Sequence, residues 1–184
     1  MRVTFIRHGE AEHNIAYLTR GDACFYDPEL KYSKLTDKGR RQASDVKLDM
    51  LPEIVVTSGL PRALSTTDII FGNSTKVVVS DIVRETNFHH IVNTRYSVDE
   101  ILLKYPHYDI SRIETDEDTV IGTVDPIDGR CTMLDELIMN LHYCGYLDIA
   151  IVSHHTFLKH YLKGKTNTDI DLDNCETFKL VIKC

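Results

Sequence analysis

The chain has 184 residues, a net charge of −7, 42% apolar residues and 27% charged residues. This composition is typical of a single globular domain that buries its own core. The negative charge argues against general nucleic-acid binding, which needs a basic face. It leaves a small anionic substrate open, because a few arginines in a cleft can dominate the local field. No apolar run approaches the roughly 18 residues of a membrane span, so we expect no membrane contact.

Short apolar runs alternate with helical segments along the chain, which is typical of an α/β sheet. We expect strands over residues 3–6, 54–57, 76–80, 148–153 and 177–183. We expect helices from about residue 36, with apolar positions at 43, 46 and 48, and over residues 61–70, 98–104, 131–142 and 156–162. The predicted fold is a three-layer sandwich, with a mostly parallel central sheet flanked by helices.

The whole chain, residues 1–184, is expected to form one domain, with a lid or insertion around residues 86–130. Its weakest stretch is 108–130, which contains ETDED and few large apolar residues. This stretch is most simply a solvated acidic loop, and the alternative is a lid over an active site. If residues 114–118 covered an anion site, they would disfavour highly charged polyphosphates by repulsion.

Cysteine usage favours a reducing compartment. The five cysteines form no CxxC pair, so reduced thiols are expected rather than a disulfide framework or a zinc site. Charged residues from Arg7 to Glu12 interrupt any apolar secretory core. We therefore expect a cytoplasmic protein, without a cofactor and without a metal. It is expected to be a monomer or a homodimer, since the last strand could lie at a sheet edge and pair with another chain.

Chemically active side chains follow four of the predicted strands: Arg7 with His8, then Arg62, Glu85 and His154. Each has a structural explanation by itself, such as a hydrogen-bonded histidine or a solvated arginine. An arginine at the start of a helix opposes the helix dipole, however, unless an anion lies between them. Ligands of α/β sheets bind beyond the carboxyl ends of the strands. Four such ends together predict an anion site.

His89 and His90 raise the possibility of metal binding. With Glu85 nearby they could act as metal ligands, but no third partner has suitable spacing. A position at the rim of the site, or simple surface exposure, explains them better.

Five short blocks occur in order along nearly the whole chain: RHGEAEHN (7–14), LTDKGRRQA (35–43), SGLPRALSTT (58–67), RET (84–86) and VSHHTFL (152–158). In sequence and order they resemble the motifs of the histidine phosphatase superfamily, also called the phosphoglycerate mutase-like fold. One departure is that Gly59 stands where a proline is more usual in the turn at 58–60.

The resemblance implies roles for individual residues. His8 would be the nucleophile that is transiently phosphorylated, and Glu85 the acid that protonates the leaving oxygen. The remaining members of the implied phosphate pocket are Arg7, Asn14, Arg62 and His154, and His154 also counts among the catalytic residues. This agrees with elementary chemistry, because neutral imidazole is a competent nucleophile and arginines can neutralise a phosphoryl group.

Within this family, a phosphatase is favoured over a mutase. The chain is short, lacks tryptophan, and has His13-Asn14 where mutases often have a Trp-Asn pair. We therefore expect a metal-independent phosphatase that hydrolyses phosphomonoesters, on a phosphorylated small molecule or a phosphoprotein. Two alternatives stay open: a phosphoglycerate-mutase-like phosphotransferase, and a non-catalytic phosphoryl-binding or protein-interaction module. A nucleotide-binding domain is disfavoured because no glycine-rich phosphate loop occurs.

Overall fold

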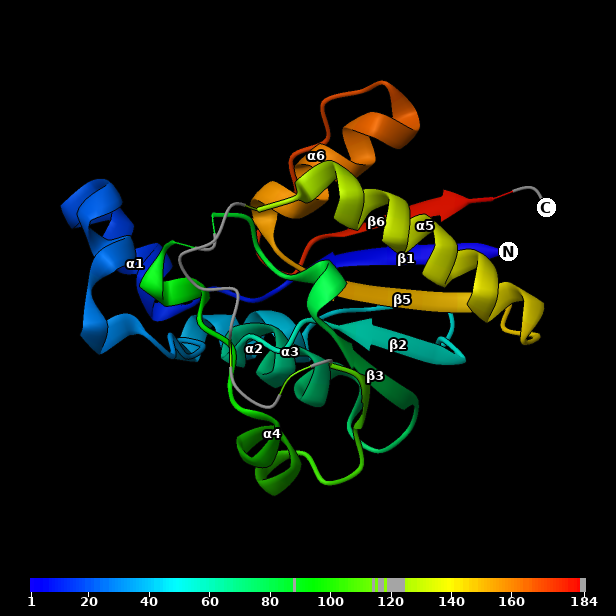
Figure 1. Cartoon of the computed structure of the whole chain (residues 1–184), viewed down its shortest axis with the longest axis horizontal. Helices are drawn as coiled ribbons and strands as arrows, with labels where there is room; N and C mark the ends of the chain where they lie inside the picture. The colour runs from blue at the N-terminus through cyan, green and yellow to red at the C-terminus, as the bar shows by residue number, and fades with distance from the viewer. Residues whose placement is uncertain (88, 114, 116–117, 119–124, 183–184) are drawn as a thin grey trace.

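The computed structural model describes the chain except for residues 88, 114, 116–117, 119–124 and 183–184. Its six-stranded sheet has the order β4-β3-β2-β5-β1-β6 (Figure 1). All paired strands are parallel except β6, which runs antiparallel to β1. The strands are β1 (Arg2–Arg7), β2 (Ile54–Thr57), β3 (Lys76–Ser80), β4 (Asp109–Arg112), β5 (Asp148–Ser153) and β6 (Thr177–Val181). The predicted mostly parallel α/β fold is confirmed.

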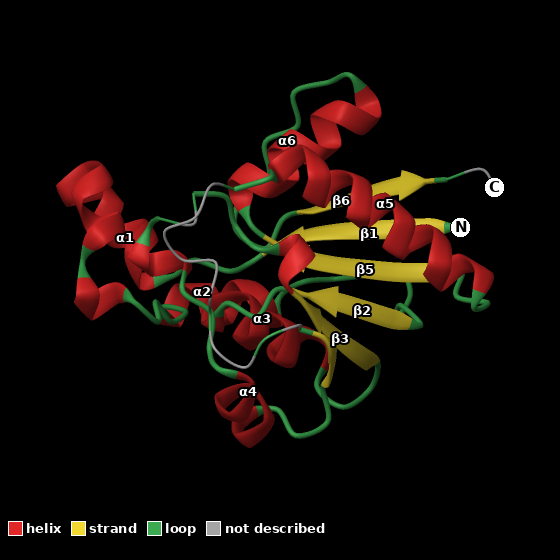
Figure 2. Cartoon of the chain, in the orientation of Figure 1, coloured by secondary structure: helices red, strands yellow, loops and turns green. Residues whose placement is uncertain are grey.

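Helices cover both faces of the sheet. They are α1 (Glu12–Arg20), α2 (Asp37–Ser44), α3 (Pro61–Phe71), α4 (Val98–Lys104), α5 (Ile127–Tyr143) and α6 (His155–Thr166). In Figure 2, α5 and α6 lie over one face, and α2, α3 and α4 lie on the other side. Short 3₁₀ helices complete the chain: η1 (Gly21–Tyr26), η2 (Pro28–Leu30), η3 (Asp81–Val83) and η4 (Ile91–Asn93).

The alternation of strand side chains produces the two layers of core. Val3 and Phe5 of β1 pack in the cluster that contains the apolar faces of α5 and α6. Ile6 points to the opposite side and packs in the cluster that contains the buried face of α3. Because both faces of the parallel strands are covered, IVVT in β2 is buried at every position.

One α-helix and one strand were not predicted from the sequence, and neither were the short 3₁₀ helices. Helix α1 follows the RHG segment directly, and strand β4 adds an edge to the sheet beside β3. The prediction of residues 108–130 as a surface excursion is therefore wrong at both ends, since Tyr108 is buried, β4 follows it and α5 already begins at Ile127. Part of the predicted lid lies outside the described residues.

The helix expected from residue 36 begins as predicted, because the Thr36 side chain accepts a hydrogen bond from the Gly39 N–H and caps the helix. It ends at Ser44, so Val46 and Leu48 lie beyond it. Strands β2, β3 and β5 have the predicted bounds, and β6 lies at the predicted sheet edge.

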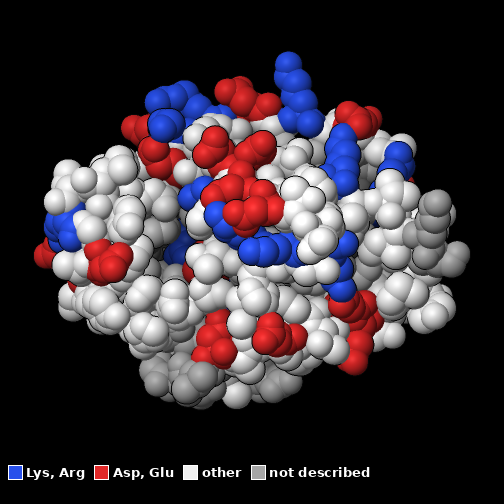
Figure 3. Space-filling view, turned by 90° about the horizontal axis from the view of Figure 1, so that it is seen from above, with Lys and Arg blue, Asp and Glu red and all other residues white. Residues whose placement is uncertain are grey.

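Surface charges are mixed on the face shown in Figure 3, where Lys and Arg side chains lie among Asp and Glu side chains. That face therefore presents no extended surface of one sign. Among the described residues, no helix is both long and apolar enough to cross a membrane.

Candidate active site

A cavity of about 410 Å³ lies where the carboxyl end of β1 meets the starts of α1, α3 and α6. Five of the six predicted site residues line it: Arg7, His8, Asn14, Arg62 and Glu85. The other lining residues are His13, Tyr17, Phe25, Asn87, His90, Val92, Asn93, His155 and Thr156. The fold thus brings side chains from four chain segments to one hollow, as expected for the carboxyl edge of a parallel sheet.

His8 is held in one orientation at the base of this cavity. Its Nδ1 lies 2.7 Å from the carbonyl oxygen of Gly9, which can only accept, so the proton is on Nδ1. The Nε2 lone pair then accepts a hydrogen bond of 3.2 Å from Nε of Arg62. Burial lowers the pKa of His8 well below its usual value, and the charge of Arg62 lowers it further. The ring is therefore neutral at pH 7, with a lone pair on Nε2.

Arg62 is the second residue of α3 and is itself fully buried. Its Nη1 donates to the Val92 carbonyl at 2.7 Å, and its Nη2 donates to Oδ1 of Asn93 at 2.8 Å. Burial lowers the pKa of Arg62 to about 10, so the guanidinium stays charged at neutral pH. These contacts hold the Arg62 cation beside the His8 ring. Among the described residues, none of the hydrogen bonds of Arg62 goes to a carboxylate.

Arg7 supplies a second cation at the same cavity. Its Nη1 donates to the Leu172 carbonyl at 2.7 Å, while its buried Nε has no hydrogen-bond partner among the described residues. Arg7 and Arg62 together give the cavity a cationic end, and guanidinium groups bind phosphate oxygens well.

His154 lies next to His8 and is not among the residues that line the cavity. Its ring centroid is 5.0 Å from that of His8, and both of its ring nitrogens are buried without a partner in the described part of the chain. Burial lowers its pKa well below the usual value, with Arg62 adding to the effect. An unpartnered buried imidazole is costly, and such a group is expected where a ligand or a change of state supplies the missing partner.

Asn14 is positioned by the start of α1. Its Oδ1 accepts a hydrogen bond from the Ala11 N–H at 2.9 Å, which leaves its Nδ2 pointing toward Nε2 of His13 at 3.2 Å. The other nitrogen of His13 lies 2.8 Å from Oγ of Ser33. His13 is buried, and its ring centroid is 5.9 Å from that of His8. The site therefore contains a third neutral imidazole, to which the sequence reasoning gave no role.

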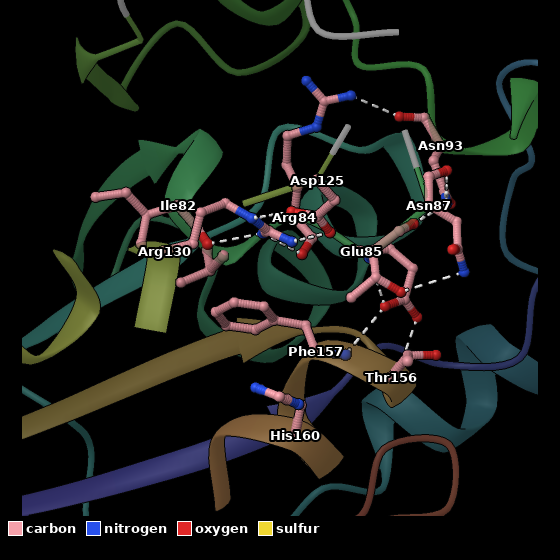
Figure 4. A network of polar contacts seen from close by, with 12 residues as sticks. Ile82, Arg84, Glu85, Asn87, Asn93, Asp125, Arg130, Thr156, Phe157 and His160 are labelled. Carbon is pink, nitrogen blue, oxygen red and sulfur yellow. Dashed lines mark hydrogen bonds and ion pairs between the residues drawn. The ribbon is translucent and has the colours of Figure 1, made fainter. Parts of the chain in front are cut away.

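Glu85 faces the cavity from the loop after η3. Its two carboxylate oxygens accept hydrogen bonds from the N–H groups of Thr156 and Phe157, at 3.1 and 3.0 Å, in the first turn of α6 (Figure 4). A third N–H, from Thr86, binds the same carboxylate at 2.8 Å. A helix N-terminus attracts negative charge. The carboxylate is thus held at a fixed place in the cavity wall.

The glycines of two sequence blocks meet under the site. A Cβ on Gly39 would lie 2.0 Å from the Glu10 carbonyl oxygen, and a Cβ on Gly9 would lie 2.6 Å from the Gly39 oxygen. The Gly9 N–H also donates to Oγ1 of Thr66 in α3 at 3.0 Å. The turn that contains His8 therefore packs closely against α2 through Gly39 and against α3 through Thr66.

Asn93 and Asn87 are site residues that the sequence reasoning missed. Asn93 orients Arg62 and donates from Nδ2 to the Thr86 carbonyl at 2.6 Å. Asn87 lines the cavity with a positive φ of 58°. Nothing in the local pattern NFHHIVNT distinguishes these amides from ordinary loop residues, so no sequence signal was available.

His90 lines the cavity, in agreement with the rim position considered for it, and His89 is exposed. Within the described residues, no group of three or more His, Cys, Asp or Glu side chains is placed to hold a metal ion. The described residues between 108 and 130 do not line the cavity. Asp118 instead forms an ion pair of 2.8 Å with the buried Arg84, so this part of the acidic stretch does not cover the anion site.

Comparison with solved structures supports the same fold. Phosphoserine phosphatase of Entamoeba histolytica, in complex with 3-phosphoglyceric acid, is 21% identical, with 98% of this chain and 90% of that chain covered and a TM-score of 0.62. A putative alpha-ribazole-5'-P phosphatase of Escherichia coli is 18% identical, with 100% and 91% covered and a TM-score of 0.64. An ecdysone phosphate phosphatase from Bombix mori, in complex with tungstate, is 14% identical, with 97% and 88% covered and a TM-score of 0.67.

A search of curated proteins gives no match. The family model of the histidine phosphatase superfamily (branch 1), in contrast, matches residues 3–182, nearly the whole chain. Together with the six-stranded sheet and the site at the end of β1, this match shows that the chain belongs to the histidine phosphatase superfamily.

Proposed function

We propose that this protein is a metal-independent phosphatase that hydrolyses phosphomonoesters through a phosphohistidine on His8. The observation that carries the proposal is the state of the His8 ring. Its Nδ1 proton is tied to the Gly9 carbonyl, while the Nε2 lone pair lies at the cavity beside the charged guanidinium of Arg62. A neutral imidazole with its lone pair next to an anion site is arranged for attack on phosphorus.

In the first step, Nε2 of His8 attacks phosphorus and the bond to the leaving oxygen breaks. The Arg62 Nε–H, now bonded to Nε2, must turn to a non-bridging oxygen, because the lone pair becomes the N–P bond. Arg7 and Arg62 neutralise charge on these oxygens, a type of contribution that is worth about 100- to 1000-fold per donor. Glu85, in its protonated form, gives its proton to the leaving alcohol.

In the second step, water attacks the phosphohistidine. The Glu85 carboxylate takes a proton from this water, and the N–P bond breaks, which returns the lone pair to Nε2 and releases phosphate. Because the three N–H groups hold the carboxylate in place, the same residue can serve both steps. His154 lies next to His8, with ring centroids 5.0 Å apart, and we assign its unpartnered ring nitrogens to the phosphoryl oxygens as additional hydrogen-bond partners.

The test is hydrolysis of an aryl phosphate from pH 4.5 to 8 in the presence of EDTA. His8→Ala is expected to lower kcat/KM by at least about 1000-fold, and Glu85→Gln to alter the pH profile of kcat. His107→Ala is the matched control, since His107 is exposed and does not line the cavity. A base-stable, acid-labile phosphoprotein after rapid mixing with labelled substrate identifies the intermediate.

Activity that EDTA removes contradicts the metal-independent reaction. Full activity in His8→Ala contradicts the assignment of the nucleophile. Transfer of label to a second hydroxyl rather than to water favours the mutase-like alternative, and phosphate binding without turnover of any ester favours the binding module.

A further inference from the structure

The cavity is larger than a phosphoryl group. Arg7 and Arg62 form its cationic end beside the neutral His8, but its volume of about 410 Å³ is in the range of sites that enclose a whole small molecule. The space that remains must hold the leaving group of the substrate. The residues around that space therefore carry information about the substrate that the phosphate pocket does not.

Three rings form a continuous wall in this part of the cavity, which we call the aromatic wall: Tyr17, Phe25 and His90. The rings of Tyr17 and Phe25 lie 5.4 Å apart at an angle of 15°, and those of Phe25 and His90 lie 4.7 Å apart at 20°. All three line the cavity. They come from α1, η1 and the segment before η4, so the fold assembles the stack from three separate places.

Neighbouring rings support the aromatic wall at its His90 end. Tyr26 meets the His90 ring edge-on at 5.2 Å and 80°, and His89 meets it at 4.6 Å and 74°. Both neighbours are exposed and neither lines the cavity. The His90 ring is thus in contact with three other rings, namely Phe25 at the cavity and Tyr26 and His89 outside it.

The aromatic wall is also neutral. Burial lowers the pKa of His90, and the neighbouring His89 lowers it further, whereas Asp22 and Glu85 act in the opposite direction. The permanent positive charges of the cavity lining are those of Arg7 and Arg62, and its carboxylate, Glu85, is held by backbone N–H groups. The cavity therefore has one end for an anion and a second, uncharged end built from parallel rings.

Resting on the phosphatase function proposed above, we infer that the substrate is a phosphomonoester whose leaving alcohol carries a planar aromatic ring, which binds at the aromatic wall of Tyr17, Phe25 and His90. Parallel and edge-on contacts between flat rings favour such a group over a saturated ring of equal size.

The test compares planar and saturated rings on leaving groups of similar basicity. Benzyl, 2-phenylethyl and 3-phenylpropyl phosphates are paired with their cyclohexyl counterparts, so that the ring reaches different depths while the phosphate stays the same. We expect the aromatic member to have the higher kcat/KM, by about 3- to 10-fold, at one or more chain lengths. Phe25→Leu and Tyr17→Leu are expected to bring this ratio close to 1.

Tyr143→Leu is the matched control. Tyr143 is a highly exposed ring on α5 that does not line the cavity, so its loss is expected to leave the ratio unchanged. Both Phe25 and Tyr17 are partly exposed, and Phe25→Leu keeps an apolar side chain, so at least one folded variant is available.

A binding arm separates failure of this inference from failure of the phosphatase function. In the corresponding phosphonates a P–C bond replaces the ester P–O bond and is not hydrolysed. Their dissociation constants are measured by calorimetry. If no ester is hydrolysed but the aromatic phosphonates bind more tightly in a Phe25-dependent manner, the phosphatase function fails and the aromatic wall stands as a subsite. Equal values for aromatic and cyclohexyl members at every length, or a preference that survives both leucine variants, overturn the inference.

Discussion

Three buried neutral imidazoles at one site make the stability of this protein sensitive to mild acid. His8, His13 and His154 are buried, and burial lowers the pKa of each well below the usual value of about 6.5. The unfolded chain binds protons on these residues as the pH falls through 6.5, while the folded chain does not. Since the unfolded state then holds more protons, the free energy of unfolding decreases on acidification.

The magnitude follows from the protonation of the unfolded state alone. A histidine that stays neutral in the fold at pH 5.5, but titrates with its ordinary pKa when unfolded, costs about 1.4 kcal/mol at that pH. Three such groups lower the free energy of unfolding by about 4 kcal/mol between pH 7.5 and 5.5. Burial raises the pKa of Asp81, which opposes this loss, and lowers the pKa of His90, which adds to it, so about 4 kcal/mol is the contribution of the three imidazoles alone.

The assay is urea unfolding at pH 7.5, 6.5 and 5.5 without phosphate. With a slope of about 2 kcal/mol per molar urea, the full loss moves the midpoint down by about 2 M. His13→Gln is expected to remove about a third of this pH dependence, while the control His107→Gln, at an exposed position, removes none of it. A midpoint that is constant or rises from pH 7.5 to 5.5 refutes the reasoning, because it requires these imidazoles to be protonated in the fold.

Two further predictions concern packing and ion pairing. Gly39→Ala places a Cβ against the Glu10 carbonyl and is expected to lower stability by about 3 kcal/mol or to prevent folding. Gly164→Ala, in the open surface of α6, is the control and is expected to stabilise by up to about 1 kcal/mol in thermal unfolding. Asp118→Asn removes the carboxylate that lies 2.8 Å from the buried Arg84, which keeps its ion pair of 3.6 Å with Asp81, and is expected to cost about 2 kcal/mol in urea unfolding, with little change in phosphate affinity. An unchanged melting temperature in Gly39→Ala or a large change in phosphate affinity in Asp118→Asn contradicts these interpretations.

The sequence predicted the strands best where burial on both faces leaves a continuous apolar run, as in β2 and β5. Helix α1 was missed because its start is occupied by the site itself and most of its surface is exposed, so no apolar stripe marks it. Strand β4 was missed because DISR at a sheet edge has no such run. In both cases tertiary contacts, rather than local propensity, determine the element.

The residues of the candidate site could be predicted where they directly follow a strand or stand at the start of a helix. His8, Arg62 and Glu85 stand next to recognisable elements, and the fold brings them to one cavity. His13 and the aromatic wall lie on α1, on η1 and just before η4, and the positions of these elements depend on contacts far along the chain. The leaving-group end of the cavity therefore became visible only in three dimensions.

The place of β1 in the sheet has a consequence for the order of folding. This strand pairs with β5 on one side and β6 on the other, so Arg2 lies opposite both Asp148 and Val181. A ribosome releases the amino-terminal strand first, and at about 5–20 residues per second its partners β5 and β6 follow only after about 7 to 35 seconds. Until then the nascent chain carries His8 on an unpaired apolar segment. Such non-local pairing is slow and exposed to aggregation, so β1 gains its second partner only after β6 has left the ribosome.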